Sequence, residues 1–141
     1  MKPRDHHNQI IIAASEEPLL RVLRHTLLSV GLGADVARSH RELVRMCSHN
    51  RYRLIISRFL SPLISSPESI ARLRGEGLTT HLFLLSHTRD QRIVVMLLEH
   101  GVNQFLSLPV SGARLVGKVL REVENRRPQC WKWCCVEVRW L

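Results

Sequence analysis

Residues 9–23, with the sequence QIIIAASEEPLLRVL, decide the fold of this chain. Residues 9–14 form a short apolar run rich in β-branched side chains, which is typical of a strand buried on both faces. An acidic pair and Pro18 follow, and proline in a first helical turn is a helix-start signal. Apolar residues then recur at helical spacing up to Gly31, at Leu19, Leu20, Val22, Leu23, Leu27, Leu28 and Val30. The stretch therefore predicts a buried strand followed by a helix that packs against it.

The same unit of a strand and a helix recurs along the chain. Further strands are predicted at residues 34–38, 54–56, 81–85 and 104–107. Further helices are predicted at about residues 39–48, 67–75, 90–100 and 111–127. Five such alternations predict an α/β fold, in which a doubly wound, five-stranded parallel sheet carries helices on both faces.

Capping residues support these helix positions. Ser39 with Glu42, and Thr88 with Gln91, have the spacing of capping boxes. Ser66 stands before Pro67, and Ser111 stands before the last helix. Gly31 and Gly33 are expected to end the first helix and Gly101 the fourth, because glycine tolerates the left-handed conformation found at helix ends, and the third helix is expected to end near Gly75.

Length and composition predict one globular domain. The chain has 141 residues, 45% of them hydrophobic, and no apolar run reaches the roughly 18 residues of a membrane span. We expect residues 1–8 to be a loose N-terminus, residues 9–127 to form the domain, and residues 128–141 to form a separate tail. With no secretion signal at the N-terminus, a cytoplasmic location and free thiols are the default expectations.

The net charge of +9 raises the question of an acidic partner. Basic residues are spread over the whole chain and no nucleic-acid recognition motif accompanies them. A nucleic-acid partner is therefore possible but not favoured over a solvated, arginine-rich surface.

Functional groups are expected where the predicted strands end. In doubly wound sheets, ligands and reacting groups gather at the carboxyl ends of the strands. The residues at those ends are Ser15 and Glu16, Ser57 and Arg58, Ser86 and His87, and Ser107 and Leu108. His87 has no acidic partner placed to complete a triad with Ser86, so we expect no enzymatic activity.

Four segments resemble the receiver domain of bacterial response regulators. They are IIIAASEEPLLRVL (10–23), YRLIISRFLSP (52–62), FLLSHTRDQ (83–91) and EHGVNQFLSLPVSGARLVGKV (99–119). Their order and spacing agree with the family over about residues 9–127. The resemblance implies a flavodoxin-like sheet with the strand order 2-1-3-4-5 and a cis peptide bond at Pro109.

The resemblance also assigns roles to single positions. The acidic pair of the family falls on Ser15 and Glu16, and its phosphoacceptor falls on Arg58. Its switch hydroxyl falls on Ser86, and its lysine falls on Leu108. The switch aromatic falls on Phe105. Glu16, Ser86 and Phe105 fit the family pattern, whereas Ser15, Arg58 and Leu108 depart from it.

These departures remove what phosphorylation requires. An acyl phosphate forms on a carboxylate nucleophile, and Mg²⁺ requires several oxygen ligands. We therefore expect no metal site and no cofactor, and we expect Arg58 to pair with Glu16 or Glu17 unless it points to solvent. The resemblance then implies a degenerate, phosphorylation-independent receiver that regulates signalling or transcription through protein contacts. The alternatives are a small DNA-associated regulator and a receiver phosphorylated at a non-standard residue such as Ser57 or Ser86.

The candidate interaction surface combines the last two predicted helices. Residues 93–98 are six consecutive apolar residues, which encircle a helix, although a helix lying on a sheet buries only one side. Exposed apolar surface usually marks a partner, unless neighbouring helices or the tail cover it. Interface residues are expected at Val94, Val95, Leu97, Leu98, Arg114, Lys118 and Arg121. The partner would be a second copy or a regulatory protein.

The tail has a composition of its own. Residues 128–141 (PQCWKWCCVEVRWL) hold all three Trp and three of the four Cys. The Cys spacing lacks a second pair or a nearby His, so a zinc site is not favoured. The tail could add to a sheet edge, cover the apolar helix, lie at a membrane interface, or be the remnant of a linker.

Overall fold

The computed structural model describes residues 9–124, apart from residues 16, 60–63 and 89. The strands are β1 (Ile10–Ala13), β2 (Ala34–Ala37), β3 (Leu54–Arg58), β4 (His81–Ser86) and β5 (Gln104–Ser107). The helices are α1 (Glu17–Leu28), α2 (His40–His49), α3 (Pro67–Gly75), α4 (Gln91–Glu99) and α5 (Gly112–Glu124). All strand pairs are parallel, and the order is β2-β1-β3-β4-β5. The predicted flavodoxin-like fold is therefore confirmed.

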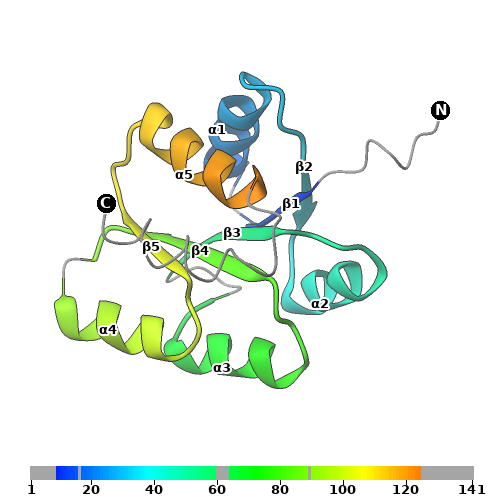
Figure 1. Ribbon diagram of the computed structural model, residues 1–141. Helices are drawn as coiled ribbons and strands as arrows, with labels where there is room; N and C mark the ends of the chain where they lie inside the picture. Colours follow the sequence, from blue (N-terminus) through cyan, green and yellow to red (C-terminus); the bar gives the residue numbers. More distant parts are fainter. Residues whose placement is uncertain (1–8, 16, 60–63, 89, 125–141) are drawn as a thin grey trace.

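The helices form a layer on each face of the sheet. Figure 1 shows α1 and α5 on one face and α2, α3 and α4 on the other. Successive residues of one strand point to opposite faces of the sheet. Ile11 packs in the cluster beneath α2–α4, and Ile12 packs in the cluster beneath α1 and α5. Every residue of β1 is buried. The continuous apolar runs of the sequence thus result from burial on both faces.

Three of the four predicted capping residues stand where the sequence placed them. The Ser39 Oγ accepts a hydrogen bond from the Glu42 backbone N–H at 3.1 Å, and the Ser111 Oγ accepts one from the Arg114 N–H at 3.1 Å. Pro67 is the first residue of α3, after Ser66. α4 starts close to the predicted residue 90, but its cap was predicted wrongly: Asp90, not Thr88, is the N-cap, and its carboxylate accepts from the Arg92 N–H at 3.0 Å.

Other sequence expectations concern the backbone. Gly31 and Gly101 follow α1 and α4 with φ values of 82° and 113°, as predicted for helix stops. Gly75 is the last residue of α3, as predicted for the end of this helix, and the positive φ of 88° lies two residues later at Gly77. The peptide bond between Leu108 and Pro109 is cis.

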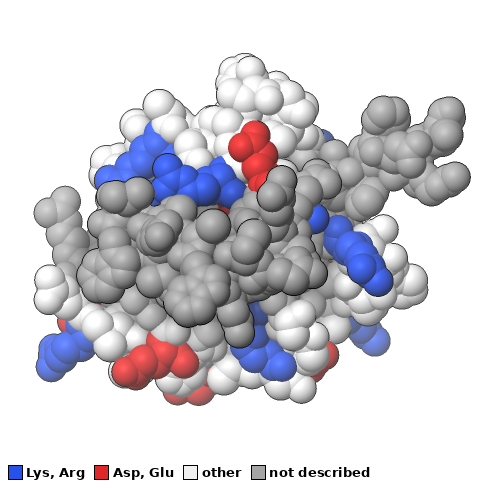
Figure 2. Space-filling model, viewed as in Figure 1, with Lys and Arg blue, Asp and Glu red and all other residues white. Residues whose placement is uncertain are grey.

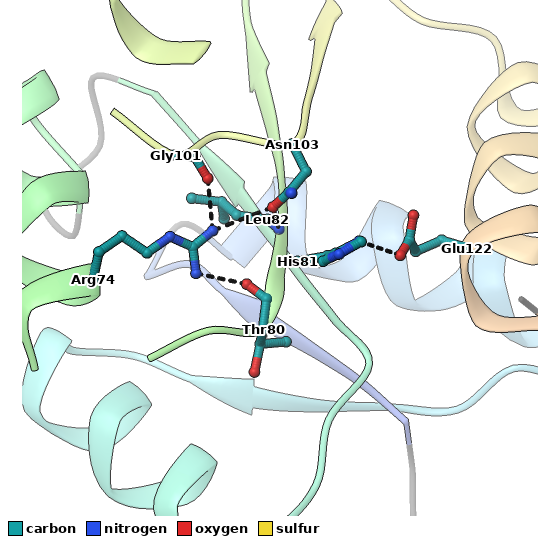
Figure 3. A network of polar contacts seen from close by, with 7 residues as sticks. All are labelled: Arg74, Thr80, His81, Leu82, Gly101, Asn103 and Glu122. Atoms are coloured by element: carbon teal, nitrogen blue, oxygen red, sulfur yellow. Dashed lines mark hydrogen bonds and ion pairs between the residues drawn. The ribbon is translucent and has the colours of Figure 1, made fainter. Parts of the chain in front are cut away.

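The amino edge of the sheet is held by one arginine. The Arg74 guanidinium, at the end of α3, donates to the carbonyl oxygens of Leu78 (2.8 Å), Thr80 (2.7 Å) and Gly101 (2.6 Å) and to the Asn103 Oδ1 (3.2 Å). The Asn103 Oδ1 also accepts from the Leu82 N–H at 2.7 Å. Figure 3 shows Thr80, Gly101 and Asn103 around the Arg74 guanidinium, with Leu82 beside Asn103. We call this set the Arg74 clamp; it joins α3 to the starts of β4 and β5.

Two further polar pairs lie on the same half of the molecule. Figure 3 shows His81, the first residue of β4, beside Glu122 of α5, with which it forms an ion pair. The Tyr52 hydroxyl donates to the Asp35 carboxylate. Burial and then this hydrogen bond raise the pKa of Tyr52 well above its ordinary value. Burial also raises the pKa of the Cys47 thiol on α2 to about 11.

The described helices include none that could cross a membrane, because each is too short or too polar. Residues 1–8 and the tail, residues 128–141, lie outside the described residues, and so do residues 125–127 at the predicted end of the last helix.

Candidate functional site

The candidate site lies at the carboxyl edge of the sheet. Arg58 is the last residue of β3 and is level with Leu85 of β4, while Ser86 ends β4 level with Ser107 of β5. Neighbouring strands are about 4.8 Å apart, so the ends of β3 and β4 are adjacent. The fold thus brings the predicted site positions Arg58, Ser86 and Leu108 to one edge, as the strand-end rule predicts.

The two serines of this edge hold the backbone in place. The Ser57 hydroxyl is buried and donates to the Ala13 carbonyl of β1 at 2.7 Å. The Ser86 hydroxyl is buried as well and accepts from the Thr88 N–H at 3.1 Å. Neither hydroxyl faces solvent, so phosphorylation at Ser57 or Ser86 would require the edge to open.

The lysine position of the family is apolar and partly buried. Leu108 packs against the cluster beneath α1 and α5, and its N–H donates to the Ser86 carbonyl at 2.7 Å. Phe105 of β5 is also partly buried, but it packs on the opposite face of the sheet, against the cluster beneath α2–α4. An aliphatic side chain at this place offers no charge to a phosphoryl group.

The acidic residues expected beside Arg58 divide into two cases. The Glu17 carboxylate forms an ion pair with the Arg38 guanidinium at 2.9 Å, and both side chains are exposed. Glu16 lies outside the described residues, so its pairing with Arg58 stays a prediction. Ser15 is half-buried after β1, and Arg58 is half-buried after β3.

A metal site would need several carboxylate, His or Cys ligands. Within residues 9–15, 17–59, 64–88 and 90–124, no three such side chains come together. The chemistry that the described strand ends of this edge offer is the Arg58 guanidinium and the exposed His87 imidazole among hydroxyl and aliphatic groups. Such a set can bind a carboxylate or another anion, but it supplies no carboxylate nucleophile.

A groove runs from this edge along α4. Its volume is about 590 Å³, and it separates α4 from β5. Its lining is Thr88, Gln91, Val94, Val95, Phe105, Ser107, Leu108 and Pro109. An adjoining hollow of about 410 Å³ shares Gln91 and Val95 and adds Arg92, Met96 and Glu99. We call the first hollow the α4–β5 groove; it is lined by two candidate interface residues, Val94 and Val95, and by Phe105, to which the resemblance assigns the switch aromatic.

One predicted interface residue is wrong. Leu97 is 0% exposed and packs in the core beneath α2–α4, so it cannot contact a partner. Val95 (52% exposed) and Leu98 (43%) are accessible, and Val94 is half-buried. Met96 is 43% exposed and was missed. The physical reason is that six consecutive apolar residues do not indicate which side of the helix faces the sheet.

The predicted basic residues lie on the outer side of α5. Arg114 and Arg121 are exposed and Lys118 is half-buried, while Leu115, Val119 and Val123 face the core. Figure 2 shows basic side chains over α5 and separate groups of them over other elements, with acidic side chains nearby. The basic side chains in this view do not form one continuous surface, and the binding of nucleic acid stays an untested alternative.

Comparisons with known proteins place this geometry in a family. No family model matches the chain. A curated relative, the transcriptional regulatory protein PcoR of Escherichia coli, is 27% identical over 128 residues, which are 91% of this chain and 57% of that protein. The chain thus spans little more than half the length of this relative.

Two solved structures match this chain over almost their whole length. The signal receiver domain of a signal transduction histidine kinase from Syntrophus aciditrophicus is 30% identical and has a TM-score of 0.68, with 86% of this chain and 96% of that one covered. The receiver domain of Francisella response regulator 1452 has a TM-score of 0.75 at 17% identity, with 86% and 100% covered.

The sheet order and these likenesses lead to one assignment. The chain belongs to the receiver-domain family of the response regulators of two-component signalling.

Proposed function

We propose that this receiver domain regulates its target without being phosphorylated. The observation that carries the proposal is Arg58 at the end of β3, the position where the resemblance places the phosphoacceptor. A guanidinium carries no carboxylate oxygen, so it cannot attack phosphorus and form an acyl phosphate. Its positive charge also opposes the binding of Mg²⁺ at the same place.

Two further departures support the proposal. Ser15 replaces one acid of the metal-binding pair, and Leu108 replaces the cation that would contact phosphoryl oxygens. Restoring the chemistry would thus need three changes at one edge. Losses at three positions are more consistent with an abandoned site than with a tuned one.

The output of such a domain would depend on binding. We propose that it acts as a homodimer or with a regulatory protein partner, through Val94, Val95 and Leu98 of α4 and Arg114, Lys118 and Arg121 of α5. The exposed apolar residues of α4 support this surface, because contiguous exposed apolar groups usually mark partner sites. The relative PcoR is a transcriptional regulatory protein, which supports a role in transcription control.

The test is a phosphodonor assay read by intact-mass spectrometry. The full chain is incubated with acetyl phosphate and Mg²⁺, and the mass is compared with that of an untreated sample. We expect no phosphoryl adduct. A stable adduct on the wild-type chain, on any residue, would overturn the proposal, and peptide mapping would then show whether Ser57 or Ser86 carries it.

A matched variant shows that the assay can detect the chemistry. The triple substitution Ser15→Asp, Arg58→Asp and Leu108→Lys restores the residues that the resemblance places at this edge. We expect this variant to gain an adduct under conditions in which the wild-type chain does not. A genuine receiver treated in parallel confirms that the phosphodonor is active, so a negative wild-type result counts.

A further inference from the structure

We propose that the tryptophan-containing segment of this same chain, residues 128–141, occupies the α4–β5 groove. The inference rests on the proposed function for the role of the surface, because it names what covers that surface before a partner binds. It makes the segment an intramolecular competitor of the partner.

The volume and lining of the groove are suited to an indole ring. Its volume of about 590 Å³ falls within the range of roughly 300–1,000 Å³ for small-molecule pockets. Its walls include Val94, Val95, Phe105 and Leu108. An indole has a large apolar body and one N–H donor, and it is stable in a site that offers both apolar walls and an acceptor. The oxygens of Thr88, Gln91 and Ser107 provide such acceptors.

The segment has the composition that the groove requires. All three tryptophans of the chain, Trp131, Trp133 and Trp140, lie within it. Each aromatic side chain removes about 150–250 Å² from water when it is buried. Lys132 stands between two of them, and Glu137 and Arg139 precede the third. Both Glu99 and Arg92 line the adjoining hollow, so charges of either sign in the segment have an opposite charge beside the apolar surface.

The length of chain is sufficient to reach the groove. The description of α5 ends at Glu124, and residues 125–141 follow. At about 3.3 Å per residue, 17 extended residues span up to about 56 Å. A five-stranded sheet is only about 24 Å wide. The segment follows α5 on one face of the sheet, whereas the groove lies beside α4 on the other face (Figure 1). Because β5 is an edge strand, the proposed path leads around the edge that β5 forms.

Tryptophan fluorescence tests the proposal in the intact protein. Because the tryptophans lie only in the segment, the emission of the folded chain reports on the segment alone. We expect the native emission to be blue-shifted from that of the denatured chain, and acrylamide quenching to be several-fold weaker. Native emission equal to that of the denatured chain would overturn the proposal.

Two matched substitutions locate the contact. Val95→Glu places a charge in the groove, where the side chain is 52% exposed, and Val22→Glu places the same charge on α1, where the side chain is 61% exposed. We expect Val95→Glu to move emission and quenching toward the denatured values and Val22→Glu to leave both unchanged, with circular dichroism confirming that both variants fold. An equal response of the two variants, or no response to Val95→Glu, would contradict the placement.

A dilution series separates the segment's own groove from that of a second copy. We expect the emission to be independent of protein concentration, because the contact is intramolecular. Emission that shifts to the red on dilution would mean that another copy supplies the groove, and the proposal as stated would be wrong. The readout uses neither phosphodonor nor partner. A phosphoryl adduct would therefore overturn the proposed function alone, and exposed tryptophans would overturn this inference alone.

Discussion

The two edges of the sheet each carry a half-buried arginine, and these arginines differ in their setting. At the amino edge, Arg74 donates to four oxygens of the chain, three of them backbone carbonyls. At the carboxyl edge, Arg58 ends β3 where the chain leaves the sheet, among the positions that carry the chemistry of the family. The first arginine is part of the fold, and the second occupies a site.

On the proposed function, this difference explains how a receiver fold can persist while the chemistry of its carboxyl edge changes. The groups that join α3, β4 and β5 lie at the amino edge, and the core lies between the edges in two apolar clusters. Ser15 and Arg58 belong to neither cluster, and Leu108 packs against one of them with an aliphatic side chain. These three residues are therefore compatible with the architecture. Four predictions test this division, from the largest expected effect to the smallest.

The first concerns the Arg74 clamp. Arg74→Ala leaves several acceptors without their charged donor, and hydrogen bonds to charged groups contribute about 1.5–3 kcal/mol each. We expect the free energy of unfolding to fall by about 3 kcal/mol in urea titrations. Arg72→Ala on the same helix, at an exposed position, should change it by less than about 0.5 kcal/mol. Equal effects of the two substitutions would show that the clamp does not stabilise the fold.

The second concerns the Cys47 thiol, which lies half-buried on α2. Burial raises its pKa from 9.0 to about 11, and only the thiolate reacts with alkylating agents. At pH 8 we expect iodoacetamide to modify Cys47 about 100-fold more slowly in the native chain than in the denatured chain, as two pKa units imply. Peptide mapping by mass spectrometry gives the rate. Equal alkylation rates in the native and the denatured chain would mean that the surroundings of Cys47 on α2 do not protect the thiol.

The third concerns Tyr52 at alkaline pH, measured in a Cys47→Ala background. Burial and the hydrogen bond to Asp35 raise the Tyr52 pKa in the folded state, so the folded chain keeps a proton that the unfolded chain loses above about pH 10. The stabilising effect is complete below that pH and is lost as pH rises further. Tyr52→Phe should cost about 1 kcal/mol at pH 7 and should remove this alkaline loss. A loss that persists in the Phe variant would assign it to other groups.

The fourth concerns the carboxyl edge itself. If Arg58 serves the site rather than the fold, Arg58→Ala should change the free energy of unfolding by no more than about 1 kcal/mol. The same urea titration provides the direct comparison with Arg74→Ala. A loss as large as that of the clamp variant would remove the distinction between the edges.

The sequence predicts most of the fold because the signals are local. Apolar runs placed β1, β3 and β4, and the side chains of Ser39 and Ser111 placed two helix starts. Thr88 was preferred to Asp90 as a cap because the capping-box spacing favoured it, although an aspartate directly before a helix caps equally well. Local patterns thus fix the elements more reliably than their first residues.

The Arg74 clamp could not be predicted in the same way. Three of its acceptors are backbone carbonyls, which exist at every residue and leave no mark on the sequence. Leu97 was misplaced for a related reason, because the phase of α4 is set by its packing and not by a run of six apolar residues. For the site, the strand-end rule located Arg58 and Ser86, but the pairing of Arg58 with Glu16 remains a prediction.

The most direct test of the central claim is a titration of the wild-type chain with Mg²⁺ and beryllofluoride, followed by amide chemical shifts in NMR spectra. Beryllofluoride imitates a phosphoryl group on a carboxylate, and this edge has a guanidinium in the acceptor position. We expect the amide signals of Ser86, Thr88 and Leu108 to stay unchanged at saturating reagent, whereas the triple variant shifts them. Saturable shifts of these amides in the wild-type chain would contradict the account.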